Sequence, residues 1–155
     1  MNPKQKKFGF VSLTGRTNVG KSTLINSILG KKISITSRKP QTTRNRILGI
    51  FSDKESQVIF LDTPGVHFGF KRQLNKVMNK LASYCYQEVD VVLFLIDRTK
   101  WLKEEENILE NLKTLNKPII LVINKIDRIK DKEHLLPFIE EINSKFKFTD
   151  IIPIS

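Results

Sequence analysis

One segment constrains the fold of this chain more than any other: residues 15–22, which read Gly-Arg-Thr-Asn-Val-Gly-Lys-Ser. The run fits G-x-x-x-x-G-K-[ST] and lies between an apolar stretch typical of a strand and a stretch with helical spacing. Its glycines let successive N–H groups turn toward an anion, and the start of the following helix adds positive charge. We expect a phosphate-binding loop in which Lys21 contacts the β- and γ-phosphates and the Ser22 hydroxyl ligates Mg²⁺. The residues expected to line this loop are Gly15, Arg16, Thr17, Asn18, Val19, Gly20, Lys21, Ser22 and Thr23.

The rest of the chain alternates between strand and helix patterns. We expect strands at 8–13, 46–51, 57–61, 91–96, 119–123 and 150–154, and helices at 22–29, 74–81, 102–115 and 132–146. A short connection joins 46–51 to 57–61, so these two form an antiparallel hairpin. The continuous apolar runs at 91–96 and 119–123 suit strands buried on both faces. The pattern predicts a three-layer α/β fold with a mostly parallel six-stranded sheet and one antiparallel strand. The acidic triplet Glu104, Glu105 and Glu106 is interpreted as a solvated helix start.

Length and composition indicate one globular domain. The chain has 155 residues, of which 39% are hydrophobic and 28% are charged. No apolar run approaches the roughly 20 residues that span a bilayer, and no secretory leader follows the basic start. The single cysteine, Cys85, excludes an internal disulfide and a multi-thiolate metal site, and two histidines are too few for a zinc centre without carboxylate ligands. We therefore expect a soluble, cytoplasmic protein.

The positive charge is concentrated at one end of the chain. Eleven of the 27 Lys and Arg residues lie within residues 1–52, which contain no acidic residue. The other basic residues balance the 16 acidic ones, so the net charge of +11 belongs to the first third. This asymmetry favours an anionic partner such as nucleotide phosphates, nucleic acid or an anionic membrane surface. A merely solvated basic face explains a charge run equally well.

A second motif ends the expected strand 57–61. It consists of Asp62, Thr63, Pro64 and Gly65. A carboxylate at Asp62 can hold Mg²⁺, and the Gly65 N–H can meet a γ-phosphate and sense its loss. Alone this is a common strand-to-turn sequence. Its strand would neighbour the strand that precedes residues 15–22, and this favours a place in the phosphate site.

A third motif follows the buried run 119–123 and consists of Asn124, Lys125, Ile126 and Asp127. The Asp127 carboxylate can accept both the N1–H and the exocyclic amine of guanine, whereas adenine offers no such pair and leaves the charge unpaired. Asn124 would brace the loop, and the stem of Lys125 can cover the base. Behind the other two motifs, this one indicates that the nucleotide is GTP or GDP.

The three motifs in this order resemble those of the translation-factor-related GTPases. Residues 32–44 resemble the switch region of the bacterial Era family, and residues 62–67 and 78–80 strengthen the match, which covers essentially the whole chain. The resemblance implies Mg²⁺-dependent hydrolysis of GTP to GDP and phosphate. It also implies association with 16S ribosomal RNA, a role in its processing and in small-subunit assembly, and in some members a peripheral position at the inner face of the membrane. A monomer is expected.

The resemblance also assigns residues to hydrolysis. Thr43 becomes the candidate switch threonine that ligates Mg²⁺ in the GTP state, with Thr42 as the alternative, because a loop hydroxyl can bind the metal when the γ-phosphate is present. Lys21, Gly65 and Asn18 complete the expected catalytic set.

The residue after D-T-P-G departs from the Ras pattern. Ras-type enzymes carry a water-orienting glutamine there, whereas this chain has Val66, so hydrolysis is expected to be slow or to use another device. The adjacent His67 would need an unusual loop geometry. Relatives with an aliphatic residue at this position imply that Asn18 holds K⁺ beside the β- and γ-phosphates.

Residues 152–155 resemble the approach to the family's last guanine-contacting loop, with Ser155 at its start. The family continues with an alanine whose N–H meets the base, a closing helix and a KH domain that binds single-stranded RNA. We interpret residues 1–155 as an Era-type P-loop GTPase domain without its final helix and without the KH domain. Two alternatives remain: a basic RNA-binding module with guanine nucleotide as a structural ligand, and a tRNA-modification GTPase, which residues 32–44 disfavour.

Overall fold

The computed structural model describes residues 7–30, 46–62 and 89–155. The strands are β1 (Lys7–Thr14), β2 (Arg46–Ser52), β3 (Ser56–Asp62), β4 (Val91–Asp97), β5 (Ile119–Asn124) and β6 (Asp150–Pro153). The helices are α1 (Lys21–Leu29), α3 (Lys103–Lys113) and α4 (Leu135–Lys145), with short 3₁₀ turns η2 (Ile126–Arg128) and η3 (Lys132–His134). The helix predicted at 74–81 lies outside the described residues.

The strands form one sheet in the order β2-β3-β1-β4-β5-β6. The hairpin partner β2 runs antiparallel to β3, and the other pairings are parallel, as predicted. The strand that ends in Asp62 lies beside β1, with Leu13 paired in register to Asp62. At the same edge of the sheet, Asp97 is paired to Asn124. The carboxyl ends of β1, β3, β4 and β5 therefore meet at one edge of the sheet.

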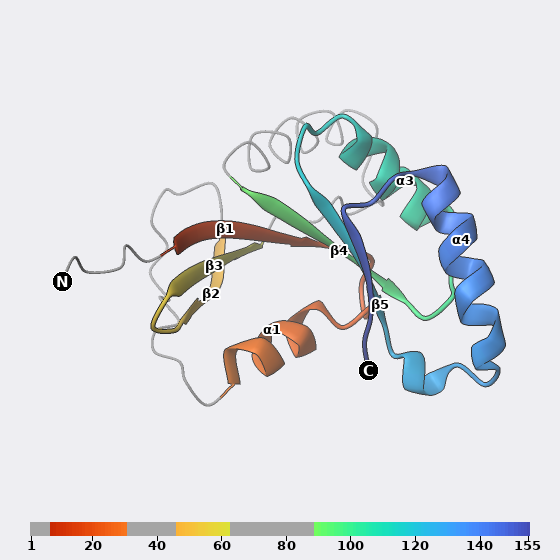
Figure 1. Cartoon of the computed structure of the whole chain (residues 1–155), viewed down its shortest axis with the longest axis horizontal. Coiled ribbons are helices and arrows are strands. Elements are labelled where there is room, and N and C mark those ends of the chain that lie inside the picture. Colours follow the sequence, from red (N-terminus) through yellow and green to blue (C-terminus); the bar gives the residue numbers. More distant parts are fainter. Residues whose placement is uncertain (1–6, 31–45, 63–88) are drawn as a thin grey trace.

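Two hydrophobic cores cover the two faces of the sheet, with α1 on one face and α3 and α4 on the other (Figure 1). Adjacent residues of β4 point into different cores: Phe94 packs with α3 and α4, whereas Leu95 packs with α1. In β5, Leu121 and Val122 divide in the same way. This alternation explains why both strands are apolar up to their polar last residues, Asp97 and Asn124, and it confirms the three-layer α/β fold.

The last helical region differs from the single helix predicted at 132–146. Its first turn is the 3₁₀ turn η3, in which the Asp131 side chain accepts the N–H of Glu133 at 3.0 Å. The α-helix begins at Leu135, and Pro137 follows within its first turn, where the missing N–H of proline costs no helical hydrogen bond. None of the helices within 7–30, 46–62 and 89–155 has both the length and the apolar character that crossing a bilayer requires.

Candidate functional site: two loops that converge at the sheet edge

The loop between β1 and α1 is held in an unusual backbone shape by its glycines. Gly15 has φ 145° and Gly20 has φ 104°, and Asn18 is left-handed at φ 62°. A Cβ on Gly15 would lie 2.4 Å from the carbonyl oxygen of Leu95, so the loop can approach β4 only without a side chain there. Val19 is buried in the core on the α1 side and anchors the middle of the loop.

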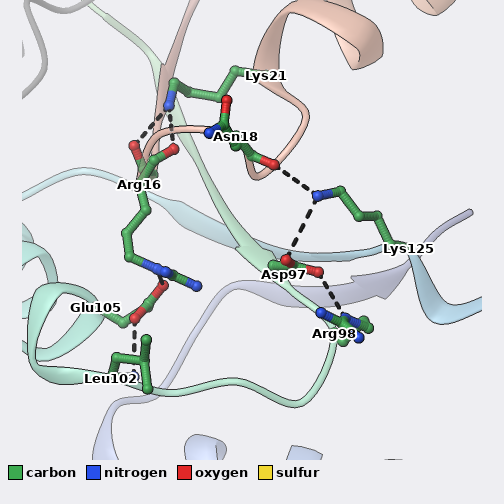
Figure 2. A network of polar contacts seen from close by, with 9 residues as sticks. Arg16, Asn18, Lys21, Asp97, Arg98, Leu102, Glu105 and Lys125 are labelled. Carbon is green, nitrogen blue, oxygen red and sulfur yellow. Dashed lines mark hydrogen bonds and ion pairs between the residues drawn. The ribbon is translucent and has the colours of Figure 1, made fainter. Parts of the chain in front are cut away.

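Lys21 begins α1 and turns back over the loop (Figure 2). Its Nζ donates to the carbonyl oxygen of Gly15 at 2.7 Å and to that of Arg16 at 2.6 Å. The ammonium is thus held against the loop next to the positive end of α1, an arrangement that suits an anionic ligand. Ser22 and Thr23 follow in the first turn and are exposed, and Thr17 is exposed in the loop itself.

Asn124 ties the second loop to the first. It ends β5 with 9% of its surface exposed, and its Nδ2 donates to the carbonyl oxygen of Val19 at 2.8 Å. Its Oδ1 accepts the N–H of Lys125 at 2.8 Å. The amide also lies close above Gly20, where an added Cβ would come within 2.2 Å of Nδ2. The bracing contact expected of Asn124 is therefore present.

Lys125 makes a second bridge between the loops. It adopts a left-handed conformation at φ 61°, and its Nζ donates to the carbonyl oxygen of Asn18 at 2.7 Å. The same ammonium lies 3.5 Å from Oδ2 of Asp97 at the end of β4. Arg98 completes the group, since its Nε donates to Asp97 Oδ1 at 3.0 Å (Figure 2). The backbone N–H of Arg98 donates to the Asn124 carbonyl oxygen at 2.8 Å.

Opposing effects act on the ionisation of Asp97. Burial tends to raise the pKa of this carboxyl, but the hydrogen bond from Arg98 and the charges of Lys125 and Arg98 outweigh burial. The net result is a lowered pKa, so Asp97 is ionised at neutral pH and can hold the Lys125 ammonium in place.

Asp127 lies in η2 with 58% of its side chain exposed, and its Oδ2 is 3.9 Å from Nε of Arg128. The backbone beside it is fixed to the end of β6, because the Ile126 N–H donates to the carbonyl oxygen of Ile154 at 3.1 Å. This contact brings Ser155, which is exposed, next to the loop that carries Asp127. The Asp127 carboxylate is thus accessible to a ligand.

Asp62 is the remaining predicted site residue within the described part of the chain. Asp62 ends β3 beside the start of the loop at Gly15. The residues outside the described part of the chain are Thr42, Thr43, Thr63, Pro64, Gly65, Val66 and His67.

One interpretation from the sequence is wrong. Glu105 is not part of a solvated helix start: its side chain is fully buried and forms an ion pair with Arg16 of the loop. The helix dipole accounts for acidic residues at a helix start, but the partner of Glu105 lies 89 residues away in the sequence. Asp97 and Arg98 were also missed, although a charged pair directly after a buried strand was an available signal.

The residues of the site fit a nucleotide with Mg²⁺. No group of three or more His, Cys, Asp or Glu side chains within 7–30, 46–62 and 89–155 could hold a metal ion by itself. Mg²⁺ is usually bound through one or two protein ligands together with phosphate oxygens, so hydroxyls such as that of Ser22 beside a phosphate cradle suit it. The cradle excludes side chains at Gly15 and Gly20, where a Cβ would collide with Leu95 and Asn124.

These features define a class of protein, the P-loop GTPases: a phosphate loop after β1 and an N-K-x-D loop after β5 meet at the carboxyl edge of a mostly parallel sheet. Residues 10–125 match the family described as 50S ribosome-binding GTPase, and the chain belongs to this family.

Several curated proteins that are similar to this chain are Era GTPases. The chain is 52% identical to GTPase Era of Pasteurella multocida (strain Pm70) over 147 residues, which cover 95% of the chain and 48% of the relative. It is 50% identical to GTPase Era of Glaesserella parasuis serovar 5 (strain SH0165) over 155 residues, 100% of the chain and 52% of the relative. The chain thus spans about half the length of the curated relatives it matches. The resemblance to Era is confirmed.

Solved structures of Era have the same fold. One is Era in complex with MgGDPNP and nucleotides 1506–1542 of 16S ribosomal RNA, with 47% identity and a TM-score of 0.76 over 97% of this chain and 52% of that one. Another is a variant of Aquifex aeolicus Era bound to GDP.AlF4−, with 45% identity and a TM-score of 0.71 over 96% of this chain and 51% of that one.

Proposed function

We propose that this chain binds GTP and hydrolyses it to GDP and phosphate as the GTPase domain of an Era-type switch protein. The observation that carries the proposal is the joining of the phosphate loop to the N-K-x-D loop, through Asn124 to Val19 and Lys125 to Asn18. A nucleotide that touches both loops at once would bind in a preformed site. The complexes of similar Era proteins with MgGDPNP and with GDP.AlF4− support this assignment.

Each end of the nucleotide would meet a different loop. The N–H groups of the phosphate loop and the Lys21 ammonium would bind the phosphate chain, and the Asp127 carboxylate would read the donors of guanine. Ser22, Asp62 and the switch threonine Thr43 would hold Mg²⁺, which neutralises charge on the β- and γ-phosphates when bound. The Gly65 N–H would meet the γ-phosphate. Ser155 lies where the family's last guanine-contacting loop begins.

Hydrolysis of GTP also requires that the attacking water be positioned next to the γ-phosphate. Val66 cannot orient water by hydrogen bonding, so the hydrolytic step would need another source of positive charge near the phosphates. Asn18 is an exposed residue of the phosphate loop, and its backbone is left-handed. We propose that Asn18 helps to hold K⁺ beside the phosphates. Equal hydrolysis rates in potassium and sodium buffers would contradict this role.

The partner of the switch is proposed by similarity. The Era structure that contains nucleotides 1506–1542 of 16S ribosomal RNA supports small-subunit RNA as the partner of the protein to which this chain belongs. Such a protein would act in small-subunit assembly in the cytoplasm, with peripheral contact to the membrane, and this domain would be monomeric. Gel-shift titration of the whole protein to which this chain belongs with nucleotides 1506–1542 of 16S ribosomal RNA, with a scrambled RNA of equal length as control, tests the RNA assignment.

Fluorescent GDP titrated against the chain tests the nucleotide site directly. Saturable binding that is competed by GTP and not by ATP is expected, and Asp127→Ala should abolish the preference for guanine. Single-turnover release of phosphate from GTP should depend on Lys21, so Lys21→Ala should remove it. Tight binding of GTP without turnover would instead favour the alternative of an RNA-binding module with a structural nucleotide.

A further inference from the structure

An ion pair between a partly buried arginine and a fully buried glutamate joins the phosphate loop to the start of α3. The Glu105 side chain is 0% exposed, and its Oε1 pairs with Nε of Arg16, whose side chain is 22% exposed. Its other oxygen, Oε2, accepts the N–H of Leu102 at 2.9 Å. Both oxygens of the buried carboxylate therefore have donors, one from the helix start and one from the loop.

Stability alone is a weak reason for such a pair. Removing a carboxylate and a guanidinium from water costs more than their attraction usually returns, and apolar replacements of similar volume are often neutral or stabilising. The pair does, however, immobilise a residue of the phosphate loop by a contact across 89 residues of sequence. Its position at this loop points to a role in the site.

Arg16 connects the ion pair to the phosphate-binding lysine. Its guanidinium faces Glu105, while its own carbonyl oxygen accepts a hydrogen bond from Lys21 Nζ at 2.6 Å. A shift of the Arg16 side chain would move the peptide group that holds the Lys21 ammonium. Figure 2 shows the continuous path from Leu102 and Glu105 through Arg16 to Lys21.

We propose that Glu105 is a positioning residue for the phosphate loop: acting through Arg16, it sets how tightly the loop binds the phosphate chain of a guanine nucleotide. The inference rests on the proposed function and extends it to a residue that lies outside the three motifs. The proposed role of Glu105 concerns the phosphate end of the nucleotide. Glu105 contacts the loop at Arg16, whereas the N-K-x-D loop contacts it at Val19 and Asn18.

The same helical turn offers a matched control. Glu106 directs its carboxylate to Trp101, where Oε2 accepts the indole Nε1–H at 2.6 Å. Each of the two substitutions Glu105→Gln and Glu106→Gln removes one negative charge, and the two positions are adjacent in α3. Only Glu105→Gln neutralises the partner of Arg16. Gln at position 105 also keeps an oxygen that can accept the Leu102 N–H, so the helix start is retained.

The experiment compares the Kd for fluorescent GDP, with GMP as competitor, in the unaltered chain and in both variants. Glu105→Gln should weaken GDP binding about tenfold or more, by analogy with the loss of affinity when the outer-shell partner of a metal ligand is removed. Competition by GMP, which lacks the β-phosphate, should change far less. Glu106→Gln should leave both values unchanged.

Glu105→Gln leaves the partly buried Arg16 charge without its partner and could lower the stability of the fold, so a second variant is included. Arg16→Met combined with Glu105→Gln removes both charges and is expected to fold, which thermal unfolding without nucleotide checks. Its loss of GDP affinity should match that of Glu105→Gln rather than exceed it, since both changes break one contact.

The outcomes separate the two proposals. If the unaltered chain binds no guanine nucleotide, the proposed function fails and this inference fails with it. If the unaltered chain binds GDP and either folded variant at Glu105 binds it equally well, the positioning role alone is overturned. An equal loss of GDP and GMP affinity would also overturn it.

Discussion

The contact between Gly20 and Asn124 gives a prediction whose size can be worked out from the structure. In Gly20→Ala the new Cβ would lie 2.2 Å from Asn124 Nδ2, well inside contact distance, and the backbone at φ 104° is itself unfavourable for alanine. The strain costs about 1–3 kcal/mol. Displacing the Asn124 amide leaves the Val19 carbonyl without its donor, which costs about 1–3 kcal/mol more.

The sum is a destabilisation of about 4 kcal/mol at the centre of these ranges, and for a chain of this size it lowers the melting temperature by about 8–16 °C. Thermal unfolding without nucleotide measures it. Gly30→Ala is the matched control, because Gly30 also has a positive φ of 35° but nothing lies within 4 Å of an added Cβ. Gly30→Ala should therefore lower the melting temperature only by the cost of the backbone strain, because no atom collides with the new Cβ.

A double-mutant cycle then isolates the collision. In an Asn124→Ala background the amide is absent, so Gly20→Ala should cost no more than the backbone strain. If Gly20→Ala destabilises the chain no more than Gly30→Ala does, or if its cost is the same with and without Asn124, the reasoning is refuted.

Two further predictions concern Asp97 and the core. Asp97→Asn should lower stability by about 1–2 kcal/mol at neutral pH in urea unfolding. The folded pKa of Asp97 lies below its unfolded value, so this difference is complete above about pH 4 and shrinks as the pH falls further; a difference that disappears near pH 7 would contradict it. Phe94→Ala, in a fully buried position, should cost about 3–5 kcal/mol, whereas Phe8→Ala, at a mostly exposed ring, should cost far less. Equal losses in thermal unfolding would contradict the assignment of the core.

The phosphate loop could be predicted because its signals are local. Eight consecutive residues carry the glycines, the lysine and the hydroxyl, and the flanking strand and helix patterns lie directly beside them. The same holds for the hairpin of β2 and β3, whose short connection leaves little choice of direction. Local rules also explain the partial error at 132–146, where Asp131 and Pro137 divide one amphipathic pattern into a 3₁₀ turn and an α-helix.

Glu105 shows where local reasoning ends. A row of three glutamates at a helix start satisfies the helix dipole, and nothing within a few residues distinguishes the middle one from its neighbours. The structure buries it against Arg16 and directs Glu106 to Trp101. Asp97 is a similar case, because its partner Lys125 comes near only when β4 and β5 lie side by side in register.

Within the described residues, the amino-acid sequence by itself indicated all six strands and the approximate positions of the helices, and it indicated which loops carry groups suited to phosphate, metal and guanine. Only the tertiary structure decided the order of the strands and the contacts of Asn124, Lys125 and Glu105 with the first loop. The physical reason is distance. Backbone preferences act within a few residues, whereas an ion pair or a buried hydrogen bond depends on atoms that folding brings together from remote positions in the chain.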